Sequence, residues 1–224
     1  MTGYDSLVLD YDGVLATVLD KEARTEACCR VAFEEFLDRD VTPQRETVQR
    51  LSRSVTPETV HTLSRQLDTT ADALWEFRDD MLATVLNEAT TAGRKRPYPD
   101  VGALADLKVP LGIASNNQRR VVTHGLTEYE MVSKFETVHA REPQLESLHN
   151  KKPAPTFLES AWADLDSQNP LYVGDKETDV LAAQRAGMDV ALIRRDHNRD
   201  RNIGHDPTYE VSSLDAVVSL FESG

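Results

Sequence analysis

Short apolar runs recur along the chain, and stretches whose apolar positions follow a helical spacing separate them. Short continuous apolar runs are typical of strands that are buried on both faces of a parallel sheet. The alternation of strand and helix predicts an α/β fold with a doubly wound, mostly parallel sheet, whose ligands bind at the carboxyl ends of the strands. The predicted strands cover residues 6–10, 109–114, 135–139, 171–174 and 190–193.

A long helical insert interrupts this alternation after the first strand. Residues 16–97 far exceed the usual connection of roughly 2–6 residues between a strand and the next element. They carry amphipathic helical patterns at residues 20–39 and 70–89, so the insert is not a plain loop. We therefore predict a core domain of residues 1–15 and 98–224 and an all-helical cap domain of residues 16–97.

The charge balance narrows the range of partners. The chain of 224 residues carries 38 acidic against 25 basic residues, which gives a formal net charge of −13. Nucleic acid is not an expected partner, because a phosphate backbone binds concentrated positive charge. Only 7 of the 25 basic residues are lysine. Such a halophilic-type acidic surface suits a cytoplasm of high salt, where self-repulsion is screened.

The N-terminal segment and the cysteines indicate a soluble, cytoplasmic protein. The chain opens without a basic segment and a following apolar run, and no stretch approaches the roughly 18 apolar residues of a transmembrane helix, so we expect no membrane partner. Cys28 and Cys29 are adjacent and poorly placed to close a loop, so we expect them to be reduced and buried. The oligomeric state stays open.

Two groups of polar residues follow the first and second predicted strands. Asp10 and Asp12 lie two positions apart, so their side chains point to the same side, and Gly13 lets the backbone turn away. Ser115, Asn116 and Asn117 follow the second strand and could hold a phosphate oxygen. Since Ser and Asn are also favoured at helix N-caps, a purely structural interpretation stays open.

Two further groups lie later in the chain. Lys151 and Lys152 precede a predicted helix, and the ammonium group of one of them could neutralise phosphate charge. Asp175 ends the fourth predicted strand and Asp179 follows one helical turn later, so both could face one ion. The alternative for Asp175 is a helix cap.

In this combination and order, the motifs resemble those of the haloacid dehalogenase superfamily, and the resemblance covers nearly the whole chain. The insert after the first motif is similar to the helical cap of phosphoglycolate phosphatases and beta-phosphoglucomutases. The resemblance implies a Rossmann-like core and a phosphatase of the phosphoglycolate phosphatase type. The chain departs from the common pattern at Val14, Thr17, Val18 and Lys176. Val14 is a known variant that leaves the chemistry intact, and the other departures leave the substrate undefined. The matching motifs are residues 9–15 (LDYDGVL), 115–116 (SN), 152–153 (KP) and 173–179 (VGDKETD).

The resemblance also implies roles for the two aspartates of the first motif. Asp10 would attack phosphorus and become transiently phosphorylated. Asp12 would protonate the leaving oxygen and then activate the water that hydrolyses the intermediate. A dianionic phosphate repels the attacking carboxylate, because each like-charge pair at about 3.5 Å costs on the order of 5 kcal/mol at an effective dielectric near 20. Compensating positive charge is therefore required.

We expect Mg2+ to supply that charge. Its hard oxygen ligands would be Asp10, Asp175 and the backbone carbonyl of Asp12, with Asp179 either at the ion or behind its ligands. The predicted groups around the phosphoryl oxygens are Ser115, Asn116 and Lys152.

The expected partner is a small phosphorylated metabolite. A phosphomutase of the beta-phosphoglucomutase type would use the same residues, and an inactive binding or regulatory protein on this fold is a further alternative. A dehalogenase does not fit, because those enzymes lack the second acid that Asp12 supplies. The six histidines show no metal-ligand spacing, and we expect residues 194–202 to form an exposed loop.

Overall fold

A computed structural model describes residues 3–36 and 39–222, and its contacts divide the chain into two compact units. The first unit consists of the residues described within 1–18, 96–141 and 150–224. The second consists of those within 19–95 and 142–149. Residues 142–149 thus group with the helical insert, whereas the sequence analysis assigned them to the core. That the units are separate domains with the predicted boundaries stays a prediction.

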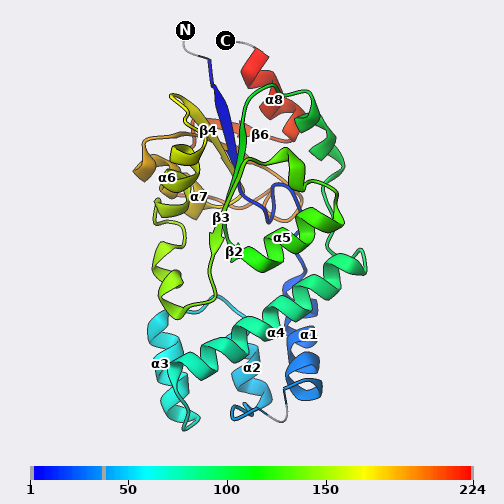
Figure 1. Cartoon of the computed structure of the whole chain (residues 1–224), viewed down its shortest axis with the longest axis vertical. Helices are drawn as coiled ribbons and strands as arrows, with labels where there is room; N and C mark the ends of the chain where they lie inside the picture. The colour runs from blue at the N-terminus through cyan, green and yellow to red at the C-terminus, as the bar shows by residue number, and fades with distance from the viewer. Residues whose placement is uncertain (1–2, 37–38, 223–224) are drawn as a thin grey trace. The chain divides into compact units, whose positions relative to one another are not determined.

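In the described residues of the first unit, six strands form one sheet in which every neighbouring pair is parallel (Figure 1). The order across the sheet is β3-β2-β1-β4-β5-β6, so β1 lies between β2 and β4. The carboxyl ends of these three central strands therefore meet at the same edge of the sheet. The strands are β1 (Ser6–Leu9), β2 (Leu111–Gln118), β3 (Thr137–Arg141), β4 (Pro170–Gly174), β5 (Asp189–Ile193) and β6 (Tyr209–Val211).

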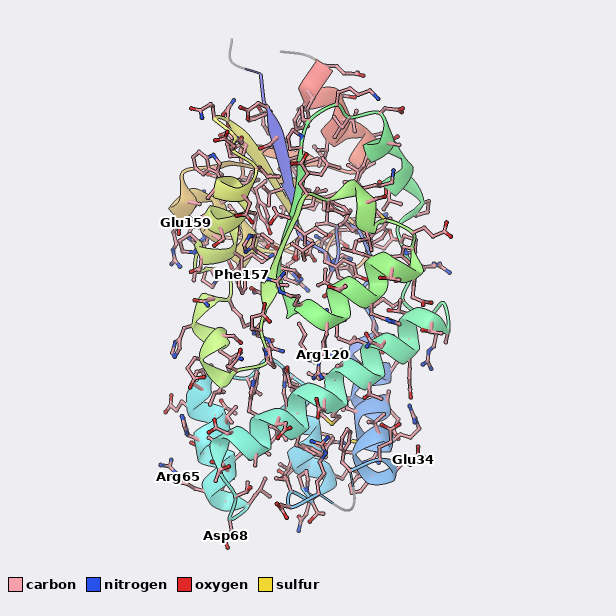
Figure 2. All side chains as sticks on the ribbon, in the orientation of Figure 1. Glu34, Arg65, Asp68, Arg120, Phe157 and Glu159 are labelled. Carbon is pink, nitrogen blue, oxygen red and sulfur yellow. The ribbon has the colours of Figure 1, made fainter. Side chains whose placement is uncertain are left out.

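Helices cover both faces of this sheet. Side chains alternate along β1, so Leu7 and Leu9 pack with residues of α5 and α8, while Val8 packs with residues of α6 and α7. Figure 2 labels Arg120 on α5 and Phe157 on α6. This arrangement confirms the predicted doubly wound α/β fold. The helices are α5 (Arg119–Glu128), α6 (Thr156–Asp164), α7 (Glu177–Ala186) and α8 (Leu214–Glu222), with 3-10 helices η1 (Pro99–Ala105) and η2 (Val132–Lys134).

The second unit is helical, as the pattern of the insert predicts. Threonine side chains cap two of its helices, since Thr56 and Thr70 accept hydrogen bonds from first-turn N–H groups. Leu145 and Leu148 pack into its apolar cluster, which explains why residues 142–149 belong here. Its elements are α1 (Lys21–Glu34), α2 (Arg45–Leu51), α3 (Pro57–Gln66), α4 (Ala71–Thr91) and the 3-10 helix η3 (Leu145–Asn150).

Two further expectations concern the same unit. Cys28 and Cys29 are buried free thiols. The helix expected over residues 20–39 ends at Glu34, and positions 37 and 38 lie outside the described residues.

Within residues 3–36 and 39–222, none of the helices has the length and the apolar character needed to cross a bilayer.

Candidate active site

The first motif lies directly after the central strand. β1 ends at Leu9, so Asp10 is the first residue beyond it, and its side chain is buried. Gly13 turns the chain with a φ of +87°, a conformation that other residues rarely adopt. A Cβ at Gly13 would also lie 2.4 Å from Asp175 Oδ2. Glycine is therefore needed here both for the turn and for the approach of Asp175 to the first motif.

Lys152 occupies the centre of a buried cluster of charges. Its ammonium Nζ lies 2.9 Å from Asp10 Oδ2 and 2.6 Å from Asp179 Oδ1. It also donates to the carbonyl of Ala114 at 3.0 Å and to the hydroxyl of Tyr172 at 2.7 Å. Only 4% of Lys152 and 4% of Asp10 are exposed. Solvent screening of these charges is therefore weak.

Burial and charge shift the pKa values of these groups in different directions. Burial raises the pKa of Asp10 to about 6; the charge of Lys152 opposes this rise and that of Asp179 adds to it. Burial disfavours the ammonium form of Lys152, but the two carboxylates outweigh it and raise the pKa of Lys152. Burial also disfavours the ionised form of Asp179, yet Lys152 and Lys176 lower its pKa. The cluster therefore favours an ammonium group between two ionised carboxylates.

The fourth motif follows β4 and opens α7. Asp179 Oδ2 accepts the N–H groups of Asp175 and Lys176 at 3.2 and 3.0 Å, so Asp179 closes the first turn of the helix. A Cβ at Gly174 would lie 2.2 Å from Asp179 Cβ, which explains the glycine before Asp175. The interpretation of Asp175 as a helix cap is therefore wrong. Its Oδ1 instead accepts a hydrogen bond from Lys176 Nζ at 2.9 Å.

Ser115 and Asn116 lie within β2, which extends to Gln118, and α5 begins only at Arg119. The alternative that they form a helix N-cap is wrong for this reason. Asn116 exchanges two hydrogen bonds with the backbone of Lys152: its amide donates to the carbonyl at 3.1 Å, and its Oδ1 accepts the N–H at 2.7 Å. These bonds hold the backbone of Lys152 so that its side chain lies in the carboxylate cluster. Of the two predicted lysines, Lys152 is therefore the one that contacts the carboxylates.

Asn117 was predicted to face a phosphate oxygen and contacts Asp12 instead, whereas His197 and Asn198 were not predicted as site residues. Asn117 donates from its amide to Asp12 Oδ2 at 2.7 Å. His197 Nε2 lies 2.7 Å from Asp175 Oδ2, and Asn198 donates to the carbonyl of Asp175 at 2.7 Å. Asn198 is only 2% exposed, so the expectation of an exposed loop is wrong at this residue. No sequence signal distinguishes it, because asparagine is common in polar loops.

The carboxylates are arranged so that they could hold a metal ion. Asp10, Asp175 and Asp179 each offer an oxygen, and these oxygens lie within 4.8 Å of one another. Carboxylate oxygens are the ligands that hard divalent cations prefer. Two ammonium groups, from Lys152 and Lys176, face three carboxylates here, so the local balance of charge favours a cation. The donor set therefore fits a divalent metal.

Comparison with known proteins agrees with this geometry. Residues 7–193 match the haloacid dehalogenase-like hydrolase family, and the chain belongs to that family. A phosphoglycolate phosphatase of Neisseria gonorrhoeae is 32% identical over 130 residues, which are 50% of this chain and 53% of that protein. The chain thus spans about half the length of the curated phosphoglycolate phosphatases that it matches.

Solved structures show the same fold over nearly the whole chain. A Lactobacillus plantarum protein assigned as a phosphoglycolate phosphatase superposes with a TM-score of 0.66 at 20% identity, covering 98% of this chain and 100% of that one. A Thermotoga maritima protein assigned as a beta-phosphoglucomutase gives a TM-score of 0.61 at 16% identity, covering 98% and 99%. At these identities the likeness concerns the fold alone.

Proposed function

We propose that the protein is a Mg2+-dependent phosphatase that hydrolyses a small phosphate monoester through an aspartyl phosphate on Asp10. The observation that carries this proposal is the buried contact of Lys152 with both Asp10 and Asp179 at the carboxyl end of the sheet. A buried carboxylate beside a fixed ammonium group can attack phosphorus while the ammonium group offsets the charge of the phosphoryl oxygens.

In the first step, an Asp10 oxygen attacks phosphorus in line, and the bond between phosphorus and the ester oxygen breaks. Asp12 gives a proton to the departing oxygen, which leaves as an alcohol. In the second step, Asp12 takes a proton from a water molecule. That water attacks the phosphorus of the aspartyl phosphate, which releases inorganic phosphate and regenerates Asp10.

Lys152 and Ser115 would bind the equatorial phosphoryl oxygens. Lys152 is suited to this role because Tyr172, Ala114 and the backbone contacts of Asn116 already hold its position. A donor that is held in place before the reaction needs no reorganisation when charge develops. Ser115 is buried on β2, which pairs with β1, the strand that leads into the first motif.

The metal ligands would be Asp10, Asp175 and the backbone carbonyl of Asp12. When bound, Mg2+ supplies positive charge that lets the Asp10 carboxylate approach a phosphate dianion. Asp179 fits a place behind the ligands, because its oxygens already accept hydrogen bonds from Tyr172, Lys176 and Asp175 and contact Lys152. By similarity to the relatives named phosphoglycolate phosphatase, the substrate would be a small phosphorylated acid.

The test is hydrolysis of an aryl phosphate and of phosphoglycolate, with Mg2+ and after its removal by a chelator. We expect turnover only with Mg2+, and its restoration when Mg2+ is added back. Asp10→Asn should lower turnover at least about 1000-fold without changing thermal unfolding, and Asp12→Ala should lose nearly all activity. Asp164→Asn, an exposed aspartate paired with His139, serves as the matched control.

Borohydride reduction of the aspartyl phosphate during turnover would release phosphate and leave homoserine at position 10, so mass spectrometry of that peptide would identify the nucleophile directly. Substantial turnover by Asp10→Asn would contradict the assignment of Asp10. Isomerisation of a hexose phosphate without release of phosphate would identify a phosphomutase instead. A wild-type protein that binds Mg2+ but converts none of these esters would support the alternative of a binding protein.

A further inference from the structure

The imidazole of His197 lies between two side chains of the first unit. Its Nε2 is 2.7 Å from Asp175 Oδ2, and its Nδ1 is 3.3 Å from the hydroxyl of Tyr98. An ionised carboxylate only accepts hydrogen bonds, so Nε2 must carry the proton that joins His197 to Asp175. In the neutral ring, Nδ1 then accepts the hydroxyl proton of Tyr98. The contact thus selects one tautomer and one ring orientation.

Asn198, the residue after His197, anchors the loop of His197 to Asp175. Asn198 donates from its amide to the carbonyls of Asp175 and Ile193 at 2.7 and 3.0 Å. Its Oδ1 accepts the N–H of Arg195 at 2.6 Å. Asn198 is buried, so this three-way contact sets the distance between the loop backbone and Asp175. His197 therefore approaches Asp175 from a fixed backbone.

The partner on the other side of the ring is also held in place. The guanidinium of Arg195 stacks over the ring of Tyr98 at 4.1 Å and pairs with both oxygens of Asp100 at 2.7 and 3.0 Å. A stacked guanidinium limits the rotation of the aromatic ring beneath it. The hydroxyl of Tyr98 is thereby presented to His197 from a restrained position.

We propose that His197, oriented by Tyr98, is a positioning residue that fixes the Asp175 carboxylate for a divalent cation. An oxygen with two lone pairs can accept the His197 N–H and still coordinate a metal. Without His197, the contact of Oδ1 with Lys176, a longer and more exposed side chain, is the one that the described residues still offer to the Asp175 carboxylate. Partners behind metal ligands typically change metal affinity by about 10-fold to 100-fold. This inference rests on the proposed metal role of Asp175.

Binding of Mg2+ to the full chain, measured by calorimetry and by competition with Mn2+, tests the inference without relying on turnover. We expect His197→Ala to raise the dissociation constant for Mg2+ at least about 10-fold. His197→Gln should restore it to within about 3-fold, because the glutamine amide can donate where Nε2 does. Tyr98→Phe should have a smaller effect. At saturating Mg2+, kcat of His197→Ala should return to within a few-fold of wild type.

His139→Ala is the matched control, because His139 Nε2 pairs with an exposed carboxylate, Asp164, at the same distance of 2.7 Å. It should leave Mg2+ binding unchanged. Wild-type binding of Mg2+ together with equal binding by His197→Ala would overturn the positioning role alone. A His197→Gln variant as impaired as His197→Ala would also overturn it. A wild-type chain that binds no Mg2+ would overturn the proposed metal site and this inference together.

Discussion

The amide of Asn117 donates a hydrogen bond to Asp12 Oδ2 at 2.7 Å. Asn117 is itself restrained, since its Oδ1 accepts the N–H of Gln118 at 2.8 Å and its own N–H donates to Ser115 Oγ at 3.3 Å. The end of β2 thus holds the side chain of the proposed general acid at the end of β1. Asn117 was predicted to face a phosphate oxygen, and its hydrogen bond with Asp12 gives it a different place in the site.

Replacing Asn117 tests whether the position of Asp12 matters for proton transfer. General acid–base catalysis contributes about 100-fold to 10,000-fold, so a misplaced Asp12 should cost part of this. We expect Asn117→Ala to lower kcat about 10-fold or more in a phosphatase assay, with a smaller change in KM. Gln184→Ala, which removes an exposed amide that donates to Asp206, is the control. An unchanged kcat in Asn117→Ala would show that Asp12 needs no such support.

Gly13→Ala tests the turn after the first motif. The substitution places a side chain on a residue with a φ of +87° and within 2.4 Å of Asp175 Oδ2. A left-handed backbone costs about 1–2 kcal/mol for a residue other than glycine, and the displaced carboxylate adds to this. We expect a loss of about 2 kcal/mol or more in unfolding free energy, measured by denaturant titration, and a loss of Mg2+ binding. Gly102→Ala, where the added Cβ meets nothing within 4 Å, should change neither property.

The pair of Asp100 with Arg195 predicts a dependence of stability on pH. Burial raises the pKa of Asp100, but hydrogen bonds from the Arg195 guanidinium and the Leu214 N–H outweigh it and lower the pKa below its ordinary value. A carboxyl group with a lowered pKa stabilises the fold above its unfolded pKa of about 4, and this contribution is lost as the pH falls through the folded pKa.

Asp100→Asn should therefore lower the unfolding free energy at pH 7, by about 1–3 kcal/mol, because the partly buried guanidinium of Arg195 loses its charged partner. The difference from wild type should shrink as the pH falls below about 4, in denaturant titrations at several pH values. Asp196→Asn, whose pair with Arg199 is exposed, is the control and should be neutral at each pH. A difference that stays constant down to pH 2 would contradict the assignment.

The net charge of −13 predicts a response to salt. Self-repulsion of a strongly acidic chain weakens as added ions shorten the screening length from about 10 Å at 0.1 M to about 3 Å at 1 M. We expect the unfolding free energy to rise from low to molar KCl, followed by circular dichroism during urea titration. Stability that stays level or declines over this range would remove the hypothesis of a halophilic-type surface.

Much of the sheet was predictable because buried strands are continuous apolar runs. β1, β3, β4 and β5 begin and end within two residues of the predicted ranges. β2 is longer than predicted, since its last residues, 115–118, are polar although they are buried or half-buried. β6 was missed, because it has three residues at the sheet edge and only partial burial. Apolar periodicity therefore predicts central strands better than polar extensions or edges.

In the candidate site, too, one part could be predicted from the sequence and another could not. That Asp10, Asp175 and Lys152 gather near one edge of the sheet follows from their places at the ends of parallel strands and before a helix. The particular contacts do not follow from the pattern. Lys152 lies between Asp10 and Asp179 because backbone hydrogen bonds to Asn116 turn it inward. Contacts of this kind depend on distances of a few ångströms between segments that are far apart in the chain.

The position of β1 between β2 and β4 determines when its side chains can pack during synthesis of the chain. β1 is synthesised before the two strands that flank it in the sheet, because β2 and β4 begin only at Leu111 and Pro170. At about 5–20 residues per second, the ribosome needs roughly 10–30 s after Leu9 before β4 has been translated. Until then the Leu7 and Leu9 side chains lack those of their final partners that lie on β4 and beyond it. The part of the core around β1 is therefore completed only after most of the chain has been made.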